Sequence, residues 1–356
     1  MTLLPPGPRI LEGFAGPGGF SEAARMLGLG PTVGYELHPN ACATATAAGH
    51  ARVRADIRTL NPAALETVEG WVSGPPCPTY SASGKRSGRG DYGTVLDGAV
   101  RVSDTPDARP VLDRLGARVA DPRTALVLET LEVALALPNL EWIVAEQVPA
   151  VRGIWEEFAA ELCGVHGWCA ADVVTLRADD FGAATRRSRV FLIACRDREP
   201  VLDGVPVREH WVCGKHQAPA LREPNWWTPF PRVSMADALG WPAGVRVNTR
   251  GARRTPGGNE FSADQPAPGL TYTARSWWRT DLGSVDGRLQ PWEAGVLQGF
   301  PPGYPWWGSR TSQFQQAADA VPPVMAVAVL GAVTGRPWQG AVWERLDRLY
   351  GRQQAA

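Results

Sequence analysis

The stretch RILEGFAGPGGFSEAARMLGLG, residues 9–30, joins a short apolar run, a glycine-rich turn and an amphipathic segment. Residues 9–15 predict a strand, and residues 21–30 predict a helix with Ser21 as N-cap and glycine at its end. In the turn FAGPGGF, glycines let the backbone approach a ligand, and the helix N-terminus offers free N–H groups. The spacing is not GxGxxG, so the turn alone indicates a ligand site only weakly.

Strands and helices alternate along the first half of the chain. Further strands are predicted at 32–36, 71–74, 141–147, 171–182 and 188–196, and helices at 39–49, 122–137 and 151–167. This alternation predicts an α/β fold with a mixed, mostly parallel sheet that helices cover on both faces.

The composition changes after about residue 198. Proline, glycine and tryptophan dominate from there, and no long periodic segment occurs until residues 321–333, which predict a helix. We therefore expect a catalytic domain at 1–197 and a smaller, irregular domain at 198–311. Residues 312–356 would supply a helix that rejoins the sheet and a C-terminal tail.

Charge and cysteine usage exclude little. The 356 residues carry no net charge, and the six cysteines contain no CxxC pair. We expect reduced thiols and no metal site. Without an apolar run near 18 residues or a basic leader, we expect no membrane span, no secretory signal and a cytoplasmic location.

Basic residues gather in three segments, at 83–90, 186–190 and 246–254. Such local patches suit phosphate contacts, although charge alone favours solvated surface loops.

Two acidic residues follow successive predicted strands. Glu36 ends the second strand and Asp56 would end a third. A glycine turn followed by an acid about twenty residues later is the order in which α/β folds bind nucleotides. The order favours an adenosine-containing cofactor.

Five stretches occur in a telling order: FAGPGGFSEAARMLGL (14–29), SGPPCPTYSASGK (73–85), EQV (146–148), DFGAATRRSRVFLI (180–193) and LQGFPPGYPW…QAADAVPP (297–323). Together they resemble the successive motifs of the cytosine-C5 DNA methyltransferase family, over most of residues 9–197 and 289–333. The resemblance implies a methyltransferase fold plus a small target-recognition domain. It also implies S-adenosylmethionine as methyl donor and double-stranded DNA as substrate.

The resemblance gives the predicted catalytic residues their roles. Cys77, held between prolines, would add as a thiolate to C6 of a flipped-out cytosine, so that C5 attacks the methyl group. Glu146 would hydrogen-bond N3 and the amino group of the base. Arg187 and Arg189 would help to hold the cytosine.

The resemblance also implies two sets of binding residues. The cofactor contacts would be Phe14, Gly16, Gly18, Glu36, Asp56, Ile57, Pro76 and Asp319. The DNA contacts would be Lys85, Arg86 and Arg89 in a closing loop, and Arg250, Arg253, Arg254, Arg275 and Arg279 in the small domain, where arginine can read guanine.

Four residues depart from the family pattern. Gln147 and Asp319 stand where asparagine is usual, Thr185 replaces a glutamine, and Trp292 replaces an arginine. A carboxylate at residue 319 would favour a cationic neighbour, so we expect it to tune cofactor preference or to weaken turnover. The chain after Cys77 is also longer than in compact members, and we expect a disordered insertion at 91–121.

Two alternatives keep most of this interpretation. In the first alternative, the chain is an RNA cytosine-5 methyltransferase of the same fold. In the second, it is a catalytically weakened DNA-binding relative. We expect a monomer that does not contact membranes, with a separate cognate restriction endonuclease as a partner in the cell.

Overall fold

In the computed structural model, which describes residues 7–76, 90–250 and 260–351, the first half of the chain builds a parallel sheet. Its strands are β1 (Ile10–Gly13), β2 (Thr32–Glu36), β3 (Arg52–Arg54), β4 (Gly70–Ser73) and β5 (Trp142–Gln147). They lie in the order β3-β2-β1-β4-β5, and all neighbours run parallel. The carboxyl ends of these strands therefore meet at one edge.

The same sheet continues with antiparallel strands to a total of nine. β7 (Ser188–Cys195) pairs with β5, and β6 (Ala170–Arg177), β8 (Glu209–Gly214) and β9 (Gln217–Arg222) follow. The sheet thus extends past residue 198, where we expected the smaller domain to begin. The mixed α/β fold is confirmed, whereas the division into domains stays a prediction.

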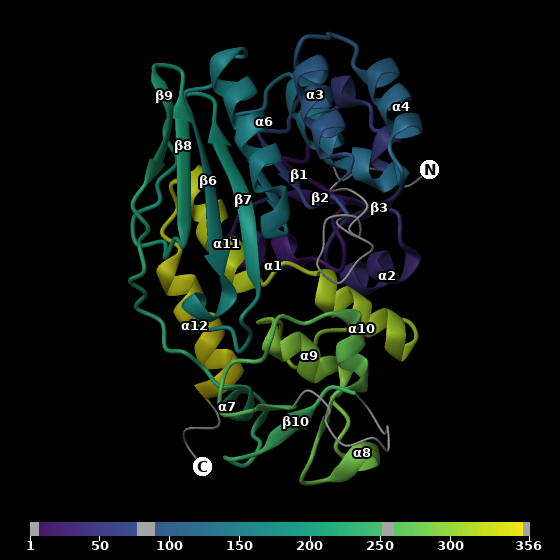
Figure 1. Ribbon diagram of the computed structural model, residues 1–356, viewed down its shortest axis with the longest axis vertical. Helices are drawn as coiled ribbons and strands as arrows, with labels where there is room; N and C mark the ends of the chain where they lie inside the picture. The colour runs from purple at the N-terminus through teal and green to yellow at the C-terminus, as the bar shows by residue number, and fades with distance from the viewer. Residues whose placement is uncertain (1–6, 77–89, 251–259, 352–356) are drawn as a thin grey trace.

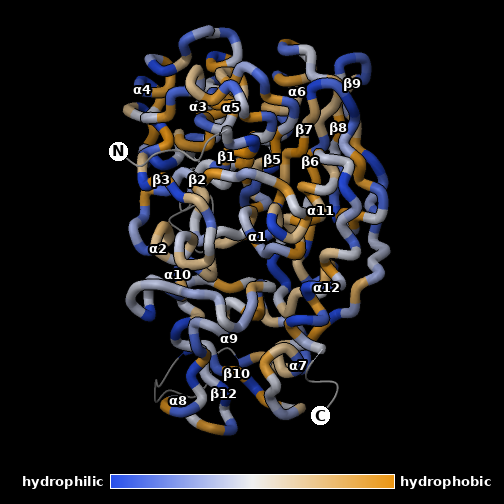
Figure 2. The backbone as a smooth tube through the Cα atoms, turned by 180° about the vertical axis from the view of Figure 1, so that it is seen from behind, coloured by the Kyte–Doolittle hydropathy of each residue, from blue (hydrophilic) through white to orange (hydrophobic). Residues whose placement is uncertain are grey.

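Helices cover both faces of the sheet (Figure 1). One face carries α3 (Tyr92–Ser103), α4 (Arg109–Arg118), α5 (Glu129–Ala136) and α6 (Arg152–Gly164). The other carries α1 (Gly19–Met26), α11 (Pro323–Thr334) and α12 (Gln339–Tyr350). Figure 2 shows the hydrophobic colour concentrated on the central strands. Each helix layer buries its own apolar cluster against one face of the sheet, as both-face coverage requires.

The expectation of a disordered insertion at 91–121 is wrong, because α3 and α4 form there. Val95, Ala99 and Val102 are buried on α3, and Leu112 and Leu115 are buried on α4. The spacings of four and three residues place these side chains on one face of each helix. Burial of this apolar face orders the segment.

The remaining elements form a smaller body below the main sheet (Figure 1). A three-stranded sheet has the order β11 (Glu260–Ser262), β10 (Arg246–Asn248) and β12 (Trp278–Arg279). The helices α7 (Met235–Leu239), α8 (Gly283–Asp286) and α9 (Pro291–Leu297) belong to this region. α2 (Pro39–Ala47) packs against β2 and β3, and α10 (Arg310–Asp319) packs between α9 and α2.

One helical stretch among the described residues, Arg310–Thr334, is long and apolar enough to cross a membrane by length and composition alone. However, 89% of its most apolar 18-residue window is buried inside the protein. The stretch comprises α10 and α11, which an extended Ala320 separates. It has the character of a core helix, so it is weak evidence for a membrane span.

Candidate functional site

The carboxyl edge of the parallel strands gathers the residues that the sequence singled out. β1 leads into Phe14, β2 ends at Glu36, and β5 ends with Glu146 and Gln147. β7 starts at the same edge, because Val190 pairs with Gln147. Ligands of open α/β sheets bind outside this edge, so it is the candidate site.

The turn after β1 is fixed by Glu36. Phe14 has a φ of 54°, in the left-handed region that non-glycine residues rarely adopt. One carboxylate oxygen of Glu36 accepts the Gly16 N–H at 2.8 Å, and the other accepts the His38 N–H at 2.6 Å. A strained turn that a carboxylate holds is typical of a functional site. Of the predicted cofactor residues, Glu36 therefore contacts Gly16, and Phe14 lies in the same turn.

Gly18 is required by close packing beneath the turn. Its φ is 113°, and a Cβ here would lie 2.8 Å from His50 Cδ2 and 2.9 Å from the Tyr304 hydroxyl oxygen. Tyr304 donates a hydrogen bond from that hydroxyl to the Pro17 carbonyl at 2.5 Å. Sequence analysis did not single out Tyr304, although it lies in the last family-like stretch.

Arg52 is a second residue that sequence analysis missed. Its buried side chain donates to the Ala15 carbonyl at 3.3 Å and to Ser21 Oγ at 3.0 Å, and lies 3.7 Å from the Glu12 carboxylate. Arginines are rarely buried without such partners. The signal available in the sequence was an arginine at the start of a short strand, four residues before Asp56. Arg52 holds the outer side of the turn.

Asp56 and Ile57 follow β3 as predicted. The Asp56 carboxylate accepts the Arg58 backbone N–H at 3.0 Å and two side-chain N–H groups at 3.0 and 2.6 Å. Hydrogen bonding from Arg58 holds the pKa of Asp56 below its usual value. Ile57 is buried. Leu37, which follows Glu36, is 63% exposed and offers an apolar face that sequence analysis missed.

Glu146 lies almost fully buried at the end of β5, with 7% exposure. Arg189 Nε is 2.7 Å from its Oε1. Burial raises the pKa of Glu146, and the charges of Arg189 and Arg187 oppose this only in part. Glu146 therefore keeps its proton to a higher pH than an ordinary glutamic acid does. A proton on this carboxyl can be donated to a ring nitrogen.

Gln147 links the end of β5 to the segment before Cys77. Its side-chain amide donates to the Pro75 carbonyl at 2.7 Å, and its side-chain carbonyl accepts the Val148 N–H at 2.5 Å. A Cβ at Gly74 would lie 4.0 Å from both Glu146 Oε2 and the Phe14 carbonyl. The turn after β1, the segment after β4 and the buried Glu146 are thus neighbours. Pro76 follows and is half-buried. Cys77, Lys85, Arg86 and Arg89 lie outside the described residues.

Arg187 connects this group to α10. Its side chain is buried, and Nη2 donates to the Asp319 carbonyl at 3.2 Å. Asp319 keeps solvent-exposed surface although protein atoms crowd its carboxylate, and its Oδ2 accepts the Gln315 amide at 2.5 Å. Burial raises the pKa of Asp319. The predicted residues of β7 and α10 therefore meet.

Thr185 and Trp292, the other two departures, lie toward the smaller body. Thr185 is fully buried and donates to the Pro268 carbonyl at 3.3 Å, which joins the loop before β7 to that body. Trp292 is exposed, whereas Glu293 beside it is buried and accepts the Trp241 indole N–H at 3.2 Å. The Glu293 carboxylate therefore has a partner within the smaller body.

The predicted DNA-binding arginines of the smaller body differ in surroundings. Arg250 is exposed, and Arg253 and Arg254 lie outside the described residues. Arg275 stacks on Tyr272 at 5.3 Å. Arg279 pairs with Asp281 at 3.0 and 2.6 Å and stacks on Trp241 at 5.0 Å. The Arg279 guanidinium therefore already has partners within the protein.

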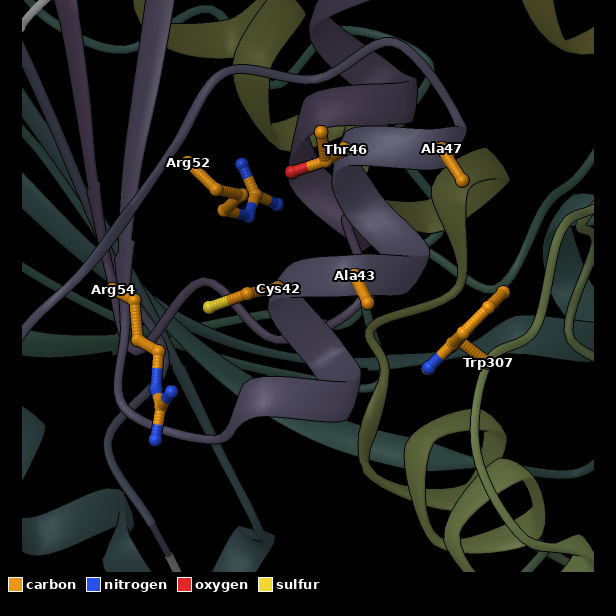
Figure 3. Close-up of a pocket in the computed structure, with 7 residues that line it drawn as sticks. All are labelled: Cys42, Ala43, Thr46, Ala47, Arg52, Arg54 and Trp307. Atoms are coloured by element: carbon orange, nitrogen blue, oxygen red, sulfur yellow. The ribbon is translucent and has the colours of Figure 1, made fainter. Parts of the chain in front are cut away.

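An open hollow of about 480 Å³ lies along α2 (Figure 3). Its lining comprises Cys42, Ala43, Thr46, Ala47, Arg52, Arg54 and Trp307, and includes none of the predicted site residues. Cys42 Sγ donates to the Glu36 carbonyl at 3.4 Å. The hollow thus borders the strand end that carries Glu36, and Arg52 lies between it and the glycine turn.

Comparisons with known proteins find similarity to cytosine-C5 DNA methyltransferases. Residues 9–96 match the C-5 cytosine-specific DNA methylase family. The type II methyltransferase M.NgoMIV of Neisseria gonorrhoeae is 22% identical over 339 residues, which are 90% of this chain and 95% of that protein. The type II methyltransferase M.AplI of Arthrospira platensis is 24% identical over 330 residues, covering 91% and 85%. The crystal structure of the S. pombe Dnmt2 methyltransferase has the same fold, with a TM-score of 0.57 at 14% identity over 92% of this chain and 98% of that one.

Proposed function

Because this chain belongs to the cytosine-C5 DNA methyltransferase family, whose methyl donor is S-adenosylmethionine, we propose that it acts on a cytosine flipped out of double-stranded DNA through a covalent adduct of Cys77. The observation that carries the proposal is the meeting of four features at one sheet edge. These are the Glu36-held turn, the Pro75 segment, the Glu146–Arg189 pair and the Asp319 end of α10.

Cys77 supplies the nucleophile in this proposal. Its thiolate forms a bond from Sγ to C6 of the cytosine, and the electron pair of the C5–C6 double bond becomes available at C5. S-adenosylmethionine, when bound, supplies an electrophilic methyl group on its sulfonium. After transfer, loss of the C5 proton and of the Cys77 thiolate restores the aromatic ring. The two residues before Cys77 are prolines, and Pro75 is anchored by Gln147, so the thiol would be presented in a fixed geometry.

Glu146 would hold the cytosine during this addition. A protonated carboxyl at this position donates to N3 and accepts from the exocyclic amino group, which offsets the negative charge that addition places on the ring. The raised pKa of Glu146 supports the protonated form. Arg189, 2.7 Å from Glu146, and Arg187 would orient that carboxyl and contact the base.

The turn and its neighbours suit a nucleoside cofactor. A Cβ at Gly16 would meet no atom of the described residues within 4 Å, so space is open above the turn. Glu36 would accept ribose hydroxyls while it holds the Gly16 N–H. Exposed Leu37 offers apolar surface for the adenine, and Ile57 and Asp56 would complete that side of the site. Phe14, Gly18, Pro76 and Asp319 would complete the cofactor contacts.

The DNA contacts are proposed from charge. Lys85, Arg86 and Arg89 would contact phosphates near the flipped base, with Arg250, Arg253, Arg254, Arg275 and Arg279 in target recognition. Because the curated relatives are named type II methyltransferases, we place this chain in restriction–modification as well. A separate endonuclease would then recognise the same sequence.

Sequencing of converted DNA from cells that express the chain tests the proposal. We expect 5-methylcytosine at one short recognition sequence, and none in cells that express Cys77→Ser at the same level. Methylation found only in RNA would instead support the RNA alternative. Absence of methyl transfer by a protein that still binds DNA would support the weakened relative.

A further inference from the structure

Asp319 ends α10 directly behind the glycine turn. The backbone two residues later packs against the start of α1, because a Cβ at Gly19 would lie 2.3 Å from the Val321 carbonyl oxygen. Gly19 itself follows the turn at Gly16–Gly18. The end of α10 is therefore fixed to the part of the chain that would hold the cofactor.

Asp319 also lies near Glu146, Arg187 and Arg189, the residues that would hold the base. Arg187 Nη2 donates to the Asp319 carbonyl at 3.2 Å, and Arg189 lies 2.7 Å from Glu146. The Asp319 and Glu146 carboxylates interact electrostatically, since the charge of Asp319 contributes to the raised pKa of Glu146. Asp319 also interacts with Glu36, whose charge raises the pKa of Asp319. Asp319 thus lies within electrostatic reach of both the cofactor turn and the base pocket.

The Asp319 carboxylate is held in place by its own helix. Gln315, one helical turn earlier, donates its amide to Oδ2 at 2.5 Å. Burial raises the pKa of Asp319, while this hydrogen bond and the charges of Arg187 and Arg189 favour the ionised form. A negative charge at this position can act on a ligand bound at the glycine turn.

Methyl transfer changes the charge of the cofactor at the reacting atom. The donor carries a sulfonium cation, and the product is a neutral thioether. A nearby carboxylate attracts the cation and gives the thioether no comparable stabilisation. Asparagine at the same position would discriminate between the two forms far less.

We propose that Asp319 is a specificity-determining residue that makes this enzyme favour its cationic sulfonium donor over the neutral thioether product, so that fresh donor displaces the product after transfer. The inference rests on the proposed function, because it places the methyl donor at the glycine turn. It goes beyond that function in assigning Asp319 the discrimination between donor and product.

Calorimetric titration of the full chain tests the proposal. The probes are S-adenosylmethionine, S-adenosylhomocysteine and sinefungin, in which a protonated amine replaces the sulfonium. In Asp319→Asn we expect the ratio of donor to product affinity to fall about tenfold, with sinefungin following the donor. In turnover, the ratio of the inhibition constant of S-adenosylhomocysteine to the KM of S-adenosylmethionine should fall in the same variant. Asp319→Glu, which keeps the charge, should retain most of the ratio, and Asp286→Asn on exposed α8 serves as control.

Each outcome separates this inference from the proposed function. If Asp319→Asn binds both ligands with the wild-type ratio, the inference is wrong while the proposed function stands. If the wild-type chain binds neither ligand, the proposed function fails first. Asp319→Ser, a second neutral variant, gives the same readout if Asp319→Asn does not fold.

Discussion

Gln147 donates its side-chain amide to the Pro75 carbonyl at 2.7 Å, across a buried contact between the end of β5 and the segment that leads into Cys77. Since neither partner is open to water, the contact would be costly to lose. It explains how a glutamine can serve where the family usually has asparagine. The longer side chain reaches Pro75 while its carbonyl caps the Val148 N–H.

Gln147→Glu should lower kcat at least tenfold, with the affinity for S-adenosylmethionine unchanged. A carboxylate of the same shape cannot donate to the Pro75 carbonyl, so the Cys77 segment loses its anchor. Single-turnover methylation and cofactor titration measure the two quantities. Gln147→Asn keeps a donor on a shorter side chain and should recover part of the rate. Wild-type kcat in Gln147→Glu would contradict the anchoring role.

Arg189→Met should lower kcat/KM by about a hundredfold, because Glu146 loses the partner that orients it. Burial raises the pKa of Glu146 and the Arg189 charge lowers it, so loss of that charge raises the pKa further. Since the protonated form acts on the base, activity falls as pH rises through this pKa. The alkaline limb of the kcat/KM profile should therefore move to higher pH. A limb that stays in place would exclude Glu146 as the group responsible.

Glu22→Gln should weaken the fold at neutral pH but not at low pH. Burial would raise the pKa of Glu22, yet hydrogen bonds from His50 and Arg345 and the charges of Arg345 and Arg25 outweigh it and lower the pKa to about 2. Because the pKa of Glu22 is lower in the folded state than its ordinary value of 4.5, its ionised form stabilises the fold at any pH above 4.5. This contribution is on the order of 3 kcal/mol, and it is lost as the pH falls from 4.5 toward 2.

Urea unfolding between pH 3 and pH 7 measures this effect. The wild type should lose free energy of unfolding over this range, and Glu22→Gln should show a flatter dependence. Glu344→Gln, which breaks the exposed pair with Arg348, is the matched control and should change stability by less than about 1 kcal/mol. Equal slopes in wild type and Glu22→Gln would contradict the role of Glu22.

Arg250 and Arg279 should differ in their effect on DNA binding. Arg250 is exposed, so Arg250→Ala should lower the slope of log affinity against log salt by about one. Arg279 is paired with Asp281 and stacked on Trp241. Arg279→Ala should therefore lower the melting temperature of the protein and change the salt slope less than Arg250→Ala does. Fluorescence anisotropy at several salt concentrations checks both. The reverse pattern would make Arg279 the phosphate contact.

The sequence predicted the parallel strands well and the inserted helices badly. The strands around Val33, Val72 and Val144 are short apolar runs followed by turns, a pattern that local preference and burial both favour. In α3 the buried residues Val95, Ala99 and Val102 stand among glycines and charged residues, which weaken the local helix signal. Packing against the core, which no local pattern reports, orders that helix.

The candidate site shows a similar division. Glu36 and Glu146 end apolar strands, so strand order alone places them at one edge. Arg52 and Tyr304 come from distant segments and support the glycine turn through side-chain contacts. Such long-range partners depend on the packed structure, so they could not be found from sequence spacing. The roles of the site residues stay predictions until substitution tests them.

Covalent capture tests the central proposal, that Cys77 attacks the base, most directly. A duplex with 5-fluorocytosine at the methylated position, incubated with S-adenosylmethionine, cannot lose the C5 substituent after transfer. We expect a denaturant-stable complex whose mass equals the chain plus the DNA plus one methyl group, with the link mapped to Cys77 and absent in Cys77→Ser. A complex that persists in Cys77→Ser, or methyl transfer by the wild type with no complex, would contradict the account.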